Sequence, residues 1–182
     1  MQAHARLVAE HAAGRTRVTT LRSAPPLTLR DTPTGVHLVS SAASPVGGDD
    51  VRLDVEVFPR AELVVRSVAA SLALPAPRPA PSHLHLEVDV GAGGRLAWIP
   101  QPTILGRGCD HRATATVRLG TGAHLVWREE LVLGRWGETT GSVLSRLRVD
   151  LDGRPLVRHD LALGPCWPGS DGPAGAAATR TG

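Results

Sequence analysis

Two short motifs contain side chains that bind transition metals. Cys109 and His111 are separated by one residue, and so are His83 and His85. Thiolate and imidazole are soft or borderline ligands, and on a β-strand both members of such a pair point to the same face. Both pairs are therefore candidates for transient metal binding. The alternative for both is surface histidine, because neither pair has a complementary pair nearby and "HLHL" fits a strand with leucine inside and histidine outside.

A second group of residues could contact a partner protein. The segment "WREELVLGRWGE", residues 127–138, partly alternates charged and apolar positions. Arginine and tryptophan are enriched at the energetic centres of protein interfaces, whereas the alternative is a solvated strand face with weak surface ion pairs. The candidates for partner contact are Arg128, Glu130, Arg135, Trp136 and Glu138.

Known catalytic motifs are absent. The sequence contains no Gly-x-Ser-x-Gly elbow, no phosphate-binding loop, no HExxH and no GxGxxG. We expect no catalytic residue, no enzymatic activity and no stably bound cofactor. A small metal-dependent enzyme that uses the Cys/His pairs remains an alternative.

These residues lie in a sequence that repeats about every thirty residues. Three stretches align without gaps: "VEVFPRAELVVR", "VDVGAGGRLAWI" and "VRLGTGAHLVWR". A fourth, "VDLDGRPLVRHDL", has a link one residue shorter, whose Asp152-Gly153 suits a type I′ turn. The stretches begin at positions 55, 88, 117 and 149, hence 33, 29 and 32 residues apart. Such spacing predicts coils that stack on one another.

Each repeat has apolar residues two apart on both sides of a short link, which is typical of two half-buried strands. "AELVVRSVAASLAL" has good helix propensity, but the Gly-Gly and β-branched residues of its aligned copies favour strand. We therefore predict a mainly β fold, a stacked-strand helicoid that resembles a β-helix, with little helix. The predicted core includes Val57, Leu63, Val90, Leu96, Leu119, Leu125, Leu151 and Leu156.

Proline and glycine predict the corners of this stack. In "LAWIPQPTILGRGC", Pro100 and Pro102 remove backbone donors between two apolar runs, and Gly106 and Gly108 permit a further change of direction. The proline-rich segment 75–81 is expected to be a connector. We predict one β-rich domain over residues 1–163 and a flexible Gly/Pro/Ala tail over residues 164–182.

Composition limits the function classes. The formal net charge is +3, and the 20 basic residues, all arginine, are scattered among 17 acidic ones without a basic stripe. We expect no nucleic-acid partner, although an Arg-dependent nucleic-acid-binding protein remains an alternative. We expect no membrane partner, since no run of about 18 apolar residues occurs. Two cysteines are too few for a disulfide framework, so we expect a cytoplasmic location.

The order of several motifs resembles the urease accessory protein family called UreD or UreH. The matching pieces are a Gly-Gly-Asp segment after a proline in "GVHLVSSAASPVGGDD", then "LAWIPQPTI", "GAHL", "GRWGE" and "DGRPLVRHD", over about residues 30 to 163. Ala97 stands where the family commonly has glutamate. The family also continues past the position of Leu163, so the resemblance is to a short or C-terminally truncated member.

The resemblance implies a non-catalytic scaffold with a β-rich helicoid fold. Members of the family help to install nickel in apo-urease, together with the accessory proteins UreF and UreG, the latter a GTPase that carries the metal. The resemblance thus implies UreF-like and UreG-like proteins and apo-urease subunits as partners, with an internal passage for nickel. Cys109 with His111 supplies two of the four or more ligands that a firm nickel site needs, so we expect any nickel to be bound weakly and transiently.

Overall fold

The computed structural model describes residues 1–167, and within this range the chain forms strands and no helix. The predicted mainly β fold is therefore confirmed, while the predicted tail lies mostly outside the described residues. No helix in residues 1–167 is long and apolar enough to cross a membrane. The strands are β1 (Gln2–Ala12), β2 (Arg15–Arg22), β3 (Leu27–Thr32), β4 (Gly35–Ser40), β5 (Asp50–Val57), β6 (Glu62–Ser67), β7 (Ser71–Ala73), β8 (Ser82–Val90), β9 (Arg95–Trp98), β10 (Thr103–Leu105), β11 (Asp110–Leu119), β12 (His124–Trp127), β13 (Leu131–Leu133), β14 (Ser142–Leu151) and β15 (Arg154–Leu163).

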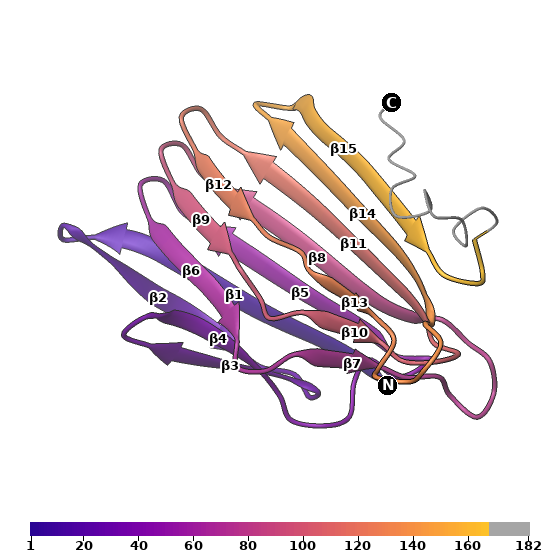
Figure 1. Ribbon diagram of the computed structural model, residues 1–182. Coiled ribbons are helices and arrows are strands. Elements are labelled where there is room, and N and C mark those ends of the chain that lie inside the picture. The colour runs from indigo at the N-terminus through magenta and orange to yellow at the C-terminus, as the bar shows by residue number, and fades with distance from the viewer. Residues whose placement is uncertain (168–182) are drawn as a thin grey trace.

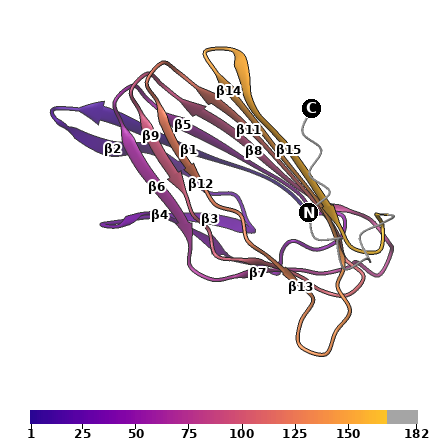
Figure 2. The same ribbon diagram turned by 45° about the horizontal axis from the view of Figure 1, so that its top comes forward.

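The described strands form three sheets. A seven-stranded sheet has the order β15-β14-β11-β8-β5-β1-β2, a five-stranded sheet the order β12-β9-β6-β4-β3, and a three-stranded sheet the order β13-β10-β7. From β5 to β14 the chain visits the three sheets in turn, and successive coils pair in parallel. Figures 1 and 2 show these coils stacked side by side. The predicted stacked-strand helicoid is thus confirmed.

Residues at the same position of successive sequence repeats pair with one another across neighbouring strands. Val55 pairs with Val88, Val88 with Val117, and Val117 with Val149 across the seven-stranded sheet. In the five-stranded sheet Leu63 pairs with Leu96, and Leu96 with Leu125. Each repeat is therefore one coil, and equivalent residues lie above one another.

The fourth repeat departs from the other three. Asp152 and Gly153 have φ values of 50° and 73° and form the predicted two-residue turn. A turn of this kind joins antiparallel neighbours, so β15 pairs with β14 in the same sheet instead of crossing to the next one. Leu156 consequently misses the core and is 58% exposed, and its prediction as a core residue is wrong.

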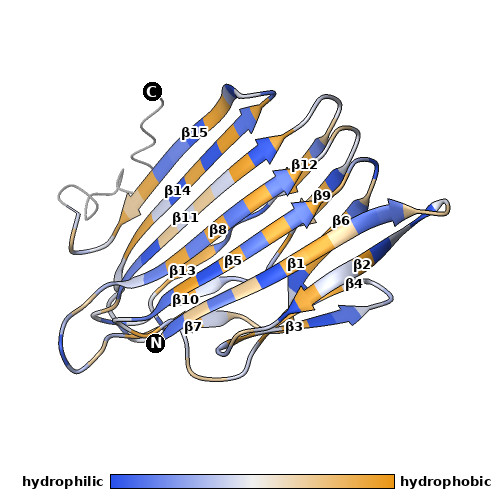
Figure 3. Cartoon of the chain, turned by 180° about the vertical axis from the view of Figure 1, so that it is seen from behind, coloured by the Kyte–Doolittle hydropathy of each residue, from blue (hydrophilic) through white to orange (hydrophobic). Residues whose placement is uncertain are grey.

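The core lies between the seven-stranded and five-stranded sheets, because alternate residues of each strand face inward. Figure 3 shows this alternation of hydrophobic and hydrophilic residues along the strands of the seven-stranded sheet. The prediction is confirmed for the buried residues Val57, Leu63, Val90, Leu96 and Leu119. Leu125 and Leu151 are partly buried and pack against the same cluster.

Proline and glycine turn the chain where the sequence predicts corners. Pro100 and Pro102 lie between β9 and β10, and the backbone N–H of Gln101 donates to Ser67 Oγ of the preceding coil at 2.8 Å. A Cβ at Gly106 would meet the carbonyl oxygen of Ala73 at 2.9 Å, so this close approach of two coils requires glycine. The proline-rich segment 75–81 connects β7 to β8, and "AELVVRSVAASLAL" contains β6 and β7, as predicted.

Candidate functional site

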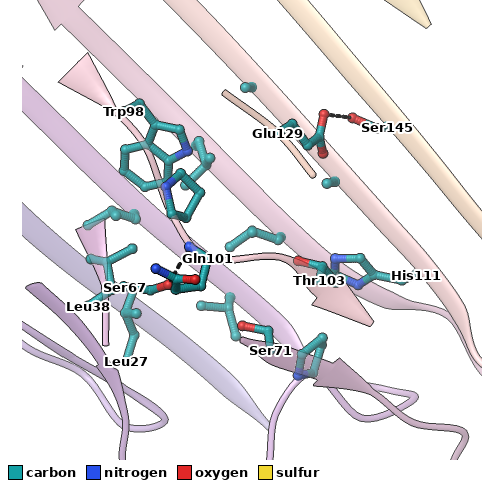
Figure 4. A pocket seen from close by; sticks show the side chains of 18 of the residues that line it. Leu27, Leu38, Ser67, Ser71, Trp98, Gln101, Thr103, His111, Glu129 and Ser145 are labelled. Carbon is teal, nitrogen blue, oxygen red and sulfur yellow. Dashed lines mark hydrogen bonds between the residues drawn. The ribbon is translucent and has the colours of Figure 1, made fainter. Parts of the chain in front are cut away.

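A cavity of about 280 Å³ lies beside the corners of three successive coils, which are the connections after β6, β9 and β12. Its walls include residues of β5, β8, β11 and β14 from one sheet, residues of β3 and β4 from the facing sheet, and the connections that follow β6, β9 and β12. Figure 4 shows Ser67, the last residue of β6, with Gln101 and Glu129 from the connections after β9 and β12, around it. Ser67 and Glu129 occupy equivalent positions of their repeats, and Gln101 lies one residue beyond the equivalent position in the repeat between them.

His111 is the buried titratable group of the cavity wall. Its side chain is 4% exposed, and Nδ1 lies 2.9 Å from the hydroxyl oxygen of Ser82. Burial, with a smaller contribution from His83, lowers the pKa of His111 to about 4, so the imidazole is neutral at neutral pH. Its second ring nitrogen makes no hydrogen bond to any described residue and remains available to a ligand in the cavity.

Glu129 places a carboxylate at the rim of the same cavity. It follows β12, is exposed, and accepts a hydrogen bond of 2.7 Å from Ser145 Oγ of β14. Ser145 itself is 3% exposed, so this hydrogen bond joins the solvent-facing rim to the wall. The carboxylate and the neutral imidazole are the two groups of the cavity best suited to a divalent cation.

Cys109 lies in a different environment from His111. It precedes β11, is 2% exposed, and packs with Ala73, Leu105 and Val143 in a small second cluster. Its Sγ donates to the carbonyl oxygen of Ser142 at 3.9 Å, and burial raises the pKa of the thiol to about 11. The surface alternative for the 109/111 pair is wrong, because both side chains are buried.

Cys166 lies near Cys109, which the sequence separation concealed. The backbone N–H of Cys166 donates to Ser142 Oγ at 2.9 Å, so both cysteines contact the same residue. Cys166 is exposed whereas Cys109 is buried. The burial of His111, in contrast, has a signal in the sequence: it lies in phase with Val117 and Leu119 of the same strand.

His83 and His85 lie on the face of β8 that points away from the core. Leu84 and Leu86, in the opposite phase, pack against the core, as the leucine-inside alternative predicts. The two imidazole rings are parallel within 3°, with centroids 5.8 Å apart. Within residues 1–167 no three His, Cys, Asp or Glu side chains are arranged to hold a metal ion.

The predicted partner residues lie at the last-coil end of the stack. Arg128 and Glu130 form an ion pair in the connection from β12 to β13. Arg135 donates to Glu138 at 2.7 Å in the loop after β13, and this hydrogen bond lowers the pKa of Glu138 to about 2. Trp136 between them is fully exposed.

Exposed apolar side chains occur on the last strand of each sheet and in the loop after β13. All three sheets finish here, with β12, β13 and β15 as their last strands. The exposed residues, which we call the last-coil patch, are Val126, Val132, Leu133, Trp136, Leu156 and Val157. The sequence signal for this surface was the all-apolar "LVL" of β13. An edge strand packs only one face against the core, so three consecutive apolar residues leave at least one apolar side chain exposed.

Comparison with known proteins places the chain in a family. A family model described as UreD urease accessory protein matches residues 1–181. The urease accessory protein UreD of Frankia casuarinae is 47% identical, over 88% of this chain and 53% of that protein. That of Parafrankia sp. is 40% identical, over 92% of this chain and 65% of that protein. Urease accessory protein UreD 2 of Saccharopolyspora erythraea is 39% identical, over 96% and 63% respectively.

The chain thus spans between about half and two thirds of the length of these relatives. The motifs on which the resemblance rested lie within the matched region. Because the family model covers nearly the whole sequence and the relatives are 39% to 47% identical over their aligned residues, this chain belongs to the UreD urease accessory protein family.

Proposed function

We propose that this chain is a non-catalytic scaffold of urease maturation, required for nickel insertion into apo-urease. It would bridge the urease apoprotein and UreF-like and UreG-like accessory proteins. The observation that carries the proposal is the family match over residues 1–181, with 47% identity to a urease accessory protein. The fold supports a scaffold because its chemistry-bearing side chains are dispersed among several environments.

The last-coil patch supports the bridging role. Free strand edges and exposed apolar side chains are costly on an isolated surface and are typical of surfaces that another protein covers. Trp136 is flanked by the Arg135–Glu138 ion pair, which gives an apolar centre with a charged rim. The predicted contacts Arg128, Glu130, Arg135, Trp136 and Glu138 therefore belong to one end of the molecule.

The cavity supports a role in nickel transit. His111 is kept neutral by burial, so its free ring nitrogen can bind Ni²⁺ without first losing a proton. Cys109 is less suitable, because a thiol with a pKa of about 11 stays protonated at neutral pH. The imidazole of His111 in the wall and the carboxylate of Glu129 at the rim are two separate ligands, each of which would hold an ion weakly and so release it.

Gene deletion in the native host tests the proposal. The deletion strain should make urease protein that lacks nickel at low external nickel, and the intact gene should restore the metal. Normal nickel occupancy in the deletion strain would refute the maturation role.

Pull-down of urease subunits and UreF-like protein from the host tests the partner surface. Val126→Asp and Trp136→Ala should reduce capture. Val68→Asp is the matched control, since Val68 is 62% exposed but lies after β6, away from the patch. Equal capture by all variants would exclude the last-coil patch as the contact surface.

A further inference from the structure

The face of the seven-stranded sheet that points away from the core has a row of charged side chains along each strand. On β5 these are Asp50, Arg52 and Asp54, and the neighbouring strand β8 places His83 opposite Asp50 and His85 opposite Arg52. Figure 3 views the molecule from this side. The imidazoles of β8 therefore lie within a two-dimensional array of charges on the face opposite the hydrophobic core, and His83 also borders the cavity described above.

Almost every arginine near the two imidazoles is bound to a carboxylate. Arg52 donates to Asp54 at 2.8 Å, on the β5 side. On the β11 side, Arg112 lies opposite His83 and donates to Asp110 at 2.9 Å. Further along the strand, Arg118 donates to Glu87 at 2.8 Å. The positive charges around the histidines are thus locally neutralised.

Asp50 differs from the other carboxylates of this face. Its side chain has no arginine partner among the described residues, and it forms an ion pair with His85, with Oδ1 3.6 Å from Nε2. The Asp50 side chain is 52% exposed and that of His85 42%. The array therefore places a carboxylate without an arginine partner beside the pair of imidazoles.

The two imidazoles can converge on one ion. His83 and His85 project from the same face of one strand, with parallel rings and centroids 5.8 Å apart. Two nitrogens bound at adjacent positions of an octahedral ion lie about 3 Å apart, because each metal–nitrogen bond is about 2.1 Å long. Both side chains are partly solvent-exposed, so rotation about their side-chain bonds can bring one nitrogen of each ring to this separation.

We infer that His83 and His85 form a surface chelate for a borderline divalent cation such as Ni²⁺, Cu²⁺ or Zn²⁺. Imidazole selects these ions over Mg²⁺ and Ca²⁺, which prefer all-oxygen sites. Asp50 supplies the compensating charge and accepts a hydrogen bond from a metal-bound water, and waters fill the remaining positions. The inference stands independently of the proposed role in urease maturation, since it concerns only the chain's own affinity for metal.

Titration calorimetry with nickel sulfate on the untagged chain tests this site. His83→Ala and His85→Ala should each weaken binding by about tenfold or more, because a chelate loses one of its two ligands. Asp50→Asn should weaken it less. His4→Ala is the matched control: His4 is exposed on the same face but binds Asp54 at 2.7 Å, and its removal should leave the affinity unchanged.

A spectroscopic measurement identifies the ligands directly. With one equivalent of Cu²⁺, the electron paramagnetic resonance spectrum should show coupling to two imidazole nitrogens, and His83→Ala should reduce this to one. Unchanged nickel affinity in a folded His83→Ala/His85→Ala double variant would overturn the inference, as would a wild-type chain that binds no nickel at millimolar concentration. Neither outcome depends on urease activity.

Discussion

The indole rings of Trp98 and Trp127 stack with centroids 5.3 Å apart and planes within 14° of parallel. They are partners in the parallel ladder between β9 and β12, and they occupy the same position of successive repeats. Trp98 is 5% exposed, whereas Trp127 belongs to the last coil and is covered on one side only. The stack therefore marks the transition from a fully covered coil to an open one.

Substitution of Trp98 by alanine should lower the free energy of unfolding by about 3 to 5 kcal/mol, because a large buried ring is lost. Trp127→Ala should cost less, since its ring is partly exposed. Trp136→Ala is the control and should change stability by no more than about 0.5 kcal/mol, because this ring lies fully in solvent. Urea denaturation measures all three, and a similar cost for Trp98 and Trp136 would contradict the described core.

His111 should make the fold sensitive to mild acid. Its folded pKa of about 4 lies below the ordinary value of 6.5, so the unfolded chain binds more protons between these values and stability falls as pH falls. From pH 7 to pH 5 this residue alone should remove about 2 kcal/mol. His111→Gln cannot take up this proton, so its unfolding midpoint in urea should change less over the same range. An equal pH dependence in both proteins would show that His111 is not buried as a neutral group.

The two cysteines should react at very different rates with a thiol reagent. Burial raises the pKa of Cys109 to about 11, so roughly one molecule in a thousand carries the thiolate at pH 8. Cys166 is exposed and should be labelled quickly. Cys166→Ser should abolish the fast phase in the native protein, and Cys109→Ser should preserve it. Rapid labelling of the Cys166→Ser variant without denaturant would contradict the burial of Cys109.

Gly141 is required by close packing. A Cβ at this position would lie 2.4 Å from Cys109 Sγ and 2.4 Å from the carbonyl oxygen of Gly106. Gly141→Ala should therefore destabilise the fold by about 3 kcal/mol. Gly14→Ala is the control, because that site has a φ of 75° but open space, and left-handed strain alone costs about 1 kcal/mol. Thermal unfolding of both variants compares the two costs, and equal shifts would contradict the contact.

Most of the fold could be predicted from spacing alone. Valines at 55, 88, 117 and 149 recur because each coil must place an inward side chain above the last, and the ladder pairs them directly. The fate of Leu156 could not be obtained from period-two alternation, because a strand in a hairpin and a strand in a coil have the same pattern. The two-residue Asp152-Gly153 link was the distinguishing signal, since the other links are long enough to cross between sheets.

The candidate site was less predictable, because its parts come from distant segments. The sequence paired Cys109 with His111 by proximity, but in the fold Cys109 contacts Ser142 and His111 contacts Ser82. The alternation of histidine and leucine in the sequence did predict that His83 and His85 point away from the core. The cavity itself depends on three connections whose side chains meet only when the coils stack, and no local pattern encodes that meeting.

The in-register ladder restricts how such a chain can change its length during evolution. Loss or duplication of one whole coil leaves every remaining pair of strands in its original alignment, whereas a single residue inserted within a strand moves all its later side chains to the opposite face. The links and corners absorb small differences, as the unequal repeat lengths already demonstrate. Length variation among homologues should therefore fall either in multiples of a coil or at the proline- and glycine-rich corners, and seldom inside β5, β8 or β11.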